Sequence, residues 1–207
     1  MAASPCGDGG RTLDPGGVMP KLLIIIGSTR PGRIGLPVAG WFSKLAVADG
    51  RFDVQLVDLA ELALPFLDEP DHPALRNYTT PHALEWSAIV DSADAIVLVT
   101  AEYNFGYPAP LKNALDYLYH EWRNKPLGFV SYGGVAAGTR SVQQLQQVTS
   151  ALQMVTVRTS VHIPFVFDML DANGELVPNA QMHAAATSMF AELEALNVTL
   201  ASARAVS

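Results

Sequence analysis

The 207-residue sequence predicts an α/β fold in which a parallel sheet carries helices on both faces. Short, uninterrupted apolar runs, such as those at residues 22–26 and 95–100, are typical of strands buried on both faces. Segments with apolar residues at helical spacing follow these runs, and strand and helix alternate five times. Five strands without a sixth favour the flavodoxin-like doubly wound order 2-1-3-4-5 over the dinucleotide-binding order of six strands.

The first half of the pattern begins with a strand at residues 21–26, which is rich in β-branched side chains and stops at Gly27. Residues 34–48 place apolar side chains at helical spacing, and residues 53–59 alternate as a second strand. Residues 60–81 contain four prolines and many polar side chains, so we expect an irregular excursion there.

The third and fourth strands are separated by one helix. A helix at 82–92 precedes the buried strand at 95–100. The next helix, at 108–121, tolerates prolines in its first turn because those amides have no intrahelical partner. The fourth strand is expected at 127–132.

The last elements are a helix at 139–152, a fifth strand at 155–161 and a long loop with turn chemistry at 163–178. Asn179 is expected to cap a final helix that runs to about Ala201. We therefore expect three segments, which are a flexible Gly- and Pro-rich extension at 1–20, one flavodoxin-like domain at 21–201 and a short tail at 202–207.

The composition excludes several classes of protein. The net charge is −7, which argues against a nucleic-acid-binding protein or a polybasic membrane anchor. No apolar run is long enough to span a membrane, and residues 1–20 lack the pattern of a secretory signal. The single cysteine, Cys6, forms no internal disulfide, and no Cys/His cluster has zinc spacing. We expect a cytoplasmic protein without a metal site.

Three loops are expected at one edge of the sheet, because ligands of such folds bind beyond the carboxyl ends of the strands. The first, at 27–35, supplies glycines, hydroxyl groups, Arg30 and Arg33 at the start of a helix. A helix N-terminus attracts anions, and arginine binds phosphate with paired hydrogen bonds, so this loop predicts a phosphate site. We expect the Arg33 side chain to be exposed there.

The second and third loops suit a flat ring system. Residues 101–110 place three aromatic side chains within five residues, next to backbone amides that are free to bind the polar edge of a ring. The third loop, at 131–140, has glycines that leave room for a ligand, and Tyr132 is placed to flank it.

The three motifs together resemble the NADPH-dependent FMN reductase family, which includes FMN-containing azoreductases, quinone reductases and chromate reductases. The motifs are G-S-T-R-P-x-R-I-G after the first strand, E-Y-N-x-x-x-P-x-x-L-K-N-A-L-D after the third, and S-x-G-G after the fourth. The resemblance covers residues 21–152 well, and it departs from the family at Ala101, where the family usually has proline.

The resemblance implies non-covalent FMN and a working form of two or four subunits. It places a phosphate on the first loop and an isoalloxazine ring against the other two. The residues implied are Ser28, Arg30, Arg33, Ile34 and Gly35 around the phosphate, Glu102, Tyr103 and Asn104 at the ring, and Ser131, Gly133 and Gly134 near the ring and ribityl chain.

The predicted function is that of an NAD(P)H oxidoreductase that passes a hydride through FMN to a quinone, azo compound, free flavin or similar small acceptor in ping-pong order. Because FMN supplies this chemistry, we assign no catalytic acid or base. A flavodoxin-like electron carrier or redox sensor without turnover remains the alternative. Three further aromatic residues lie on the helix at 108–121 or just beyond it, and we expect them to form a subunit interface rather than core: Tyr117, Tyr119 and Trp122.

Overall fold

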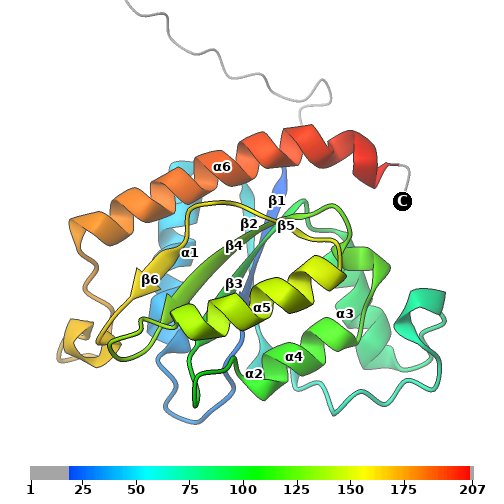
Figure 1. The fold of residues 1–207 in the computed structure, drawn as a ribbon, viewed down its shortest axis with the longest axis horizontal. Helices are drawn as coiled ribbons and strands as arrows, with labels where there is room; N and C mark the ends of the chain where they lie inside the picture. The colour runs from blue at the N-terminus through cyan, green and yellow to red at the C-terminus, as the bar shows by residue number, and fades with distance from the viewer. Residues whose placement is uncertain (1–18, 206–207) are drawn as a thin grey trace, which may run out of the picture.

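The computed structural model describes residues 19–205, and its sheet confirms the predicted strand order. Parallel strands lie in the order β2-β1-β3-β4-β5, and a sixth strand, β6, also pairs with β4 (Figure 1). The strands are β1 (Lys21–Ile26), β2 (Asp53–Asp58), β3 (Ala95–Ala101), β4 (Pro126–Tyr132), β5 (Val155–Thr156) and β6 (Val161–Ile163).

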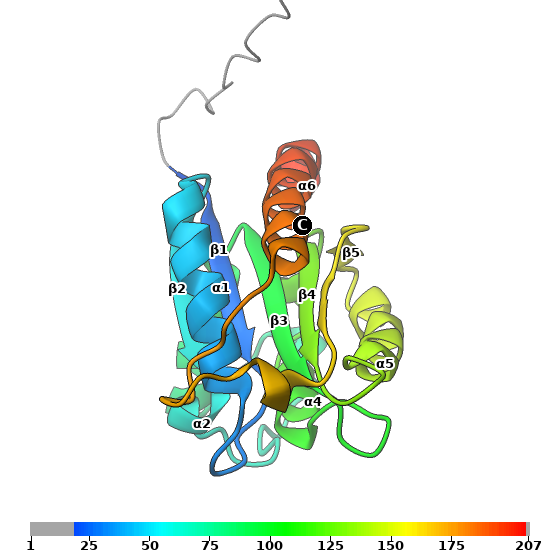
Figure 2. The same ribbon diagram turned by 90° about the vertical axis from the view of Figure 1, so that its left-hand side faces the viewer.

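Helices cover both faces of the sheet, as the alternating pattern predicts. Helices α1 and α6 lie side by side on one face, and α3, α4 and α5 pack on the other (Figures 1 and 2). The α-helices are α1 (Gly35–Asp49), α2 (Leu59–Leu62), α3 (Pro81–Asp91), α4 (Ala109–Asp116), α5 (Thr139–Ala151) and α6 (Ala180–Arg204), with short 3-10 helices at Pro73–Leu75, His120–Trp122 and Val166–Met169.

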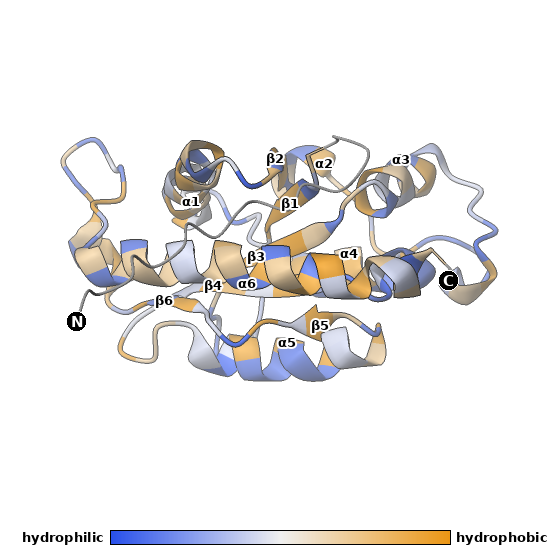
Figure 3. Cartoon of the chain, turned by 90° about the horizontal axis from the view of Figure 1, so that it is seen from above, coloured by the Kyte–Doolittle hydropathy of each residue, from blue (hydrophilic) through white to orange (hydrophobic). Residues whose placement is uncertain are grey.

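The continuous apolar strands are explained by burial from both sides. In β1, Ile24 and Ile26 face the α1/α6 layer, whereas Leu23 and Ile25 face the layer formed by α3, α4 and α5. In Figure 3, the visible part of β1 is coloured mainly as hydrophobic, whereas the helices carry both colours. Burial of apolar surface stabilises the folded state by about 25 cal/mol per Å². Because both faces of the sheet are buried, this free energy fixes the sheet and the edge from which the loops emerge.

The predicted fifth strand is broken into two pieces, β5 and β6. Between them, the Thr159 amide donates to Glu192 of α6 (2.9 Å), and the Thr159 hydroxyl also bonds to that carboxylate. A backbone amide that donates to a helix side chain cannot also donate to a neighbouring strand of the sheet. The sequence pattern contains no signal for this long-range contact, so the prediction of one strand at 155–161 was wrong in that detail.

The helix predicted at 108–121 ends early, at Asp116, and its aromatic residues are mostly core. Tyr117 and Trp122 are fully buried within the chain, and Trp122 packs edge-on against Trp86 with ring centroids 5.9 Å apart. The prediction that these two residues form a subunit interface was therefore wrong, since apolar partners within the same chain cover them. Tyr119 is half-buried.

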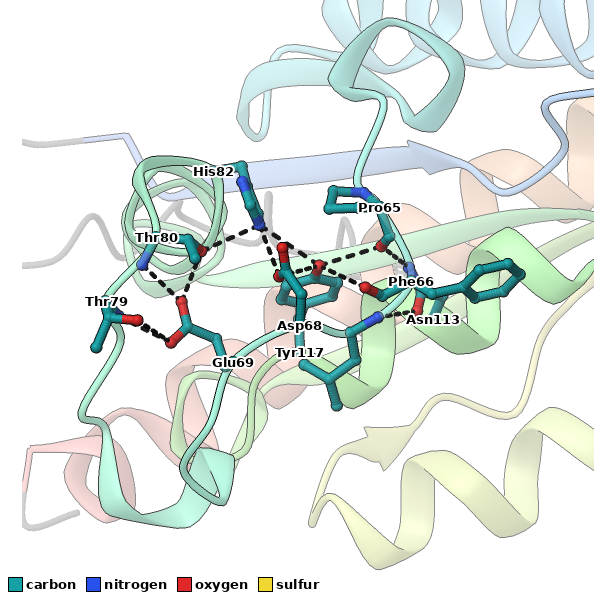
Figure 4. Close-up of polar contacts among 10 residues, drawn as sticks. Pro65, Phe66, Asp68, Glu69, Thr79, Thr80, His82, Asn113 and Tyr117 are labelled. Carbon is teal, nitrogen blue, oxygen red and sulfur yellow. Dashed lines mark hydrogen bonds and ion pairs between the residues drawn. The ribbon is translucent and has the colours of Figure 1, made fainter.

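The excursion predicted at 60–81 is irregular but well anchored to α3 and α4 (Figure 4). The Tyr117 hydroxyl lies 2.9 Å from Asp68 Oδ1 and 3.1 Å from the Pro65 carbonyl. The hydrogen bond from His82 lowers the pKa of Asp68, and burial raises the pKa of Tyr117 to about 12. The Glu69 carboxylate accepts hydrogen bonds from the amides and hydroxyls of Thr79 and Thr80, just before α3. These bonds replace a backbone ladder in ordering the segment.

The two ends of the predicted domain differ in what the structure describes. The predicted extension at 1–20 falls almost wholly outside the described residues. At the other end, Asn179 caps α6 as expected, because its side chain accepts the Met182 amide (2.9 Å). Helix α6 continues to Arg204, three residues past the predicted end, and Arg204 Nη1 donates to the Asn124 carbonyl (3.1 Å).

Candidate functional site

The loops that follow β1, β3 and β4 meet at the carboxyl edge of the sheet, which is the lower end in Figure 2. The buried Ser28 hydroxyl of the first loop bonds directly to the Tyr103 hydroxyl of the second. The Glu102 amide of the second loop donates to the carbonyl of Tyr132, which ends β4 and belongs to the third loop (3.3 Å). Residues implied by three separate motifs are therefore neighbours.

The first loop delivers the N-terminus of α1 to this edge. The Arg33 amide donates to the Arg30 carbonyl (3.1 Å) in a tight turn, and Gly32 adopts a φ of 69°, which favours glycine. Ile34 occupies the N-cap position of α1, and its apolar side chain makes no capping hydrogen bond. The amides of Gly35 and Leu36 are thus left to bind an acceptor, because Pro37 has no N–H and the Val38 amide donates to the Ile34 carbonyl (3.3 Å). The helix dipole favours a negatively charged acceptor.

The two arginines of this loop differ in environment. The Arg30 side chain is exposed. Arg33 is not, since its side chain is only 13% exposed and Nη2 forms an ion pair with Asp58 at the end of β2. Asp58 Oδ1 also accepts the Ala60 amide (2.9 Å) and so caps α2. Asp58 therefore ties the first loop to the neighbouring strand, a contact that the sequence analysis missed.

Two buried polar atoms at this edge lack a hydrogen-bond partner among the described residues. They are Nε of Arg33 and the hydroxyl of Tyr132, whose side chain is almost completely buried. Buried donors are nearly always paired in folded proteins, so these atoms indicate an acceptor that does not belong to the protein chain. A phosphate beside the first turn of α1 supplies such acceptors, and the residues present therefore fit the phosphate group of FMN.

The second loop is a tight hairpin that presents aromatic rings. Tyr103 and Gly106 exchange backbone hydrogen bonds (2.8 and 2.9 Å), and both intervening residues have positive φ, 50° at Asn104 and 71° at Phe105. Such φ values cost non-glycine residues roughly 1 kcal/mol or more each, so the surrounding contacts must impose this conformation.

Contacts from α5 hold that hairpin in place. Glu102 accepts from Arg140 Nη1 (2.7 Å) and from the Arg140 amide (3.2 Å), and the Arg140 guanidinium lies 4.2 Å from the centre of the Phe105 ring. Phe105 remains 63% exposed and Tyr103 38% exposed. The hairpin thus carries fixed, accessible aromatic surface of the kind that binds a flat ring.

The third loop is organised by the fully buried Ser131. Its hydroxyl donates to the Ala137 carbonyl (2.7 Å) and accepts from His162 Nδ1 (2.7 Å), and burial lowers the pKa of His162. Gly133 donates its amide to the Ile163 carbonyl (3.2 Å), whereas Gly134 is exposed. The Ser131 hydroxyl is therefore committed to contacts within the protein, which join the third loop to β6.

A hollow of about 240 Å³ adjoins the first loop, and it brings part of the excursion to the border of the site. Its lining residues come from the first loop, from α2 with the residues after it, and from α4: Thr29, Leu59, Ala60, Ala63, Leu64, Pro110 and Asn113. The sequence of residues 60–81 indicates only an irregular connection, because proline and polar content predicts irregularity and not position.

A metal-binding cluster and a membrane-spanning helix are both absent from the part of the chain that the structure describes. Within residues 19–205, no group of three or more His, Cys, Asp or Glu side chains is arranged to hold a metal ion. No helix of the same region is long and apolar enough to cross a membrane.

Comparisons with known proteins show the family that the chain resembles. The family model described as NADPH-dependent FMN reductase matches residues 20–168. An NAD(P)H-dependent FMN reductase of Schizosaccharomyces pombe is 43% identical over 139 residues, which cover 66% of this chain and 69% of the relative. An NAD(P)H-dependent FMN reductase of Saccharomyces cerevisiae is 37% identical over 174 residues, which cover 79% and 90%.

A solved structure supports the fold. The flavoenzyme NAD(P)H:(acceptor) oxidoreductase of Paracoccus denitrificans aligns with a TM-score of 0.70 at 19% identity, covering 85% of this chain and 98% of that one. At this level of identity, the likeness concerns the arrangement of the strands and helices alone.

Proposed function

The chain belongs to the NADPH-dependent FMN reductase family, and from this premise we propose that it is an FMN-dependent NAD(P)H oxidoreductase acting on a small electron acceptor. One observation carries the assignment to this site. The uncapped N-terminus of α1, with unpartnered donors on Arg33 and Tyr132, lies beside an aromatic hairpin at the point where the strand order reverses. A phosphate and a flat ring joined by a short chain match that pair of surfaces.

The residues divide into two groups according to the part of FMN that they would hold. Around the phosphate we place Ser28, Arg30, Arg33, Ile34 and Gly35. At the ring and ribityl chain we place Glu102, Tyr103, Asn104, Ser131, Gly133 and Gly134. Glu102 has its carboxylate committed to Arg140, so its contact with the ring would come from the backbone.

The chemistry that FMN supplies when bound is the acceptance of a hydride from NADPH or NADH and the return of two electrons to an acceptor. The protein binds and orients the ring, and no side chain is assigned as a catalytic acid or base. Exposed aromatic surface at the hairpin suits flat molecules and discriminates little between them, so we propose a quinone, azo compound, free flavin or similar acceptor.

Donor and acceptor would use the same opening in turn, because the three loops enclose one edge of the sheet. We therefore propose ping-pong order, in which the oxidised nucleotide leaves before the acceptor enters. A homodimer or homotetramer and a cytoplasmic location complete the proposal. They rest on the family and on the single cysteine of the composition.

The test begins with the flavin of the purified protein. We expect a flavin absorbance spectrum, release of FMN and not FAD on denaturation, and NAD(P)H oxidation in the presence of a quinone. Initial rates at several fixed acceptor concentrations should give parallel double-reciprocal lines. Intersecting lines would exclude ping-pong order. Flavin binding without turnover would instead favour an electron carrier.

A further inference from the structure

The Tyr132 hydroxyl lies beneath the first turn of α1 and close to the Ser28 hydroxyl, which is bonded to Tyr103. It meets no acceptor with hydrogen-bond geometry within residues 19–205. Tyr132 is the last residue of β4, and its backbone is fixed by pairing with Ala101 of β3 and Ile163 of β6. Its side chain reaches towards β1, because a Cβ added to Gly35 would lie 2.9 Å from the hydroxyl oxygen and 3.0 Å from Ile26 Cγ2. The ring therefore points at the start of α1.

The space that the ring occupies depends on small neighbours. Ala101 is the residue directly opposite Tyr132 in the ladder, and Gly35 is the first residue of α1. A larger side chain at position 35 would collide with the hydroxyl. The packing thus accommodates a phenol whose polar end is placed between β1 and the helix N-terminus.

A phenylalanine would fill this site without the energetic penalty of an unpaired hydroxyl. Burying a polar group without a partner destabilises a protein, whereas an apolar group of the same shape is neutral or stabilising. Burial raises the pKa of the Tyr132 phenol, so the group stays protonated and remains a donor. The other unpaired donor of this edge, Nε of Arg33, belongs to the turn that precedes the same helix.

We propose that the Tyr132 hydroxyl donates a hydrogen bond to the FMN phosphate and so makes Tyr132 a specificity-determining residue that favours FMN over riboflavin. The proposal rests on the proposed function, since it requires FMN to place its phosphate at the N-terminus of α1. The phosphate oxygens are acceptors, and the first-turn amides, Arg33 Nε and the phenol are all donors. Riboflavin lacks these acceptors, so its binding should not depend on the phenol.

The decisive variant is Tyr132→Phe, which removes the hydroxyl and keeps the ring. Flavin-free protein would be titrated with FMN and with riboflavin by quenching of flavin fluorescence, and its thermal unfolding would be followed by circular dichroism. We expect the FMN dissociation constant to rise about ten- to a hundredfold, as for loss of one hydrogen bond to a charged group. The riboflavin constant should stay unchanged, and the Tm should be equal to or higher than that of the wild type.

Tyr117→Phe is the matched control. Tyr117 is also buried, but its hydroxyl lies within hydrogen-bond distance of Asp68 and Pro65. This variant should lower the Tm and leave both flavin constants unchanged. If Tyr132→Phe folds poorly, Tyr132→Met, which also lacks the hydroxyl, should show the same selective loss of FMN affinity.

Three results would overturn the proposal. Unchanged FMN affinity in Tyr132→Phe would mean that water satisfies the hydroxyl. Equal weakening of FMN and riboflavin would place the contact away from the phosphate. Failure of the wild-type protein to bind FMN would refute the proposed function itself, and the role of Tyr132 with it, so the two failures can be told apart.

Discussion

Replacing Arg33 with alanine tests whether the first loop is anchored by Asp58 before any ligand binds. The two side chains are 13% and 7% exposed, so the substitution leaves a buried carboxylate oxygen without its partner. Loss of one buried, charge-assisted contact costs about 1–3 kcal/mol of unfolding free energy. Asp58→Ala also removes the cap of α2 at the Ala60 amide, which adds about 1 kcal/mol. Both single variants break the same ion pair. We therefore expect the loss of unfolding free energy in the double variant to be about 1–2 kcal/mol smaller than the sum of the losses in the two single variants.

The assay is urea unfolding of the flavin-free protein, followed by circular dichroism for the wild type, both single variants and the double variant. Arg30→Ala is the control, since its exposed side chain should change the unfolding free energy by less than about 0.5 kcal/mol. Additive effects of Arg33→Ala and Asp58→Ala would refute the anchoring role. In the proposed enzyme, Arg33→Ala should also weaken FMN binding about ten- to a hundredfold.

Three further predictions concern the scaffold around the site. Gly138→Ala should lower the unfolding free energy by roughly 2 kcal/mol or more, because φ is 80° and the new Cβ would lie 2.7 Å from Ser131 Cβ; Gly134→Ala, with open space, is the control in the same urea titration. Burial lowers the pKa of Lys125 from 10.5 to about 8, so between pH 8 and 10 the unfolded chain binds more protons there and stability should rise with pH, by at most about 1.4 kcal/mol per unit. Lys125→Met should remove that slope, and equal slopes in both proteins would contradict the assignment. Asn179→Ala should lower the unfolding free energy by about 1 kcal/mol through loss of the α6 cap, and an unchanged denaturation midpoint would contradict it.

The sheet and the meeting of the three loops were predictable because each depends on local sequence. A strand buried on both faces has to be apolar at nearly every position, as β1 shows over residues 22–26 and β3 over residues 95–99. Once the strand order is known, the carboxyl edge and its loops follow from topology alone. The contact between Ser28 and Tyr103 therefore agrees with an expectation drawn from strand patterns and motif positions.

What the sequence did not indicate are contacts between groups that are distant in the chain. Arg33 and Asp58 are separated by a helix and a strand, and the sequence around each residue does not predict the ion pair. The interruption between β5 and β6 likewise depends on Glu192, which lies in another element. The burial of Tyr117 was misjudged because an aromatic stripe on a helix suits a core and an interface equally well. Each of these details depends on tertiary packing, which overrides local preference.

The charge distribution at the first loop indicates that phosphate recognition depends more on the positions of the hydrogen-bond donors than on net charge. One of the two arginine charges is offset by Asp58, and the chain as a whole carries a net charge of −7. Long-range attraction of a phosphate dianion is therefore weak, and it would be screened further by salt. The donors at this edge, in contrast, are fixed by the helix, by the ion pair and by the packing of Tyr132 beneath Gly35. Affinity for FMN should accordingly vary little with ionic strength, and it should fall sharply when a single donor such as the Tyr132 hydroxyl is removed.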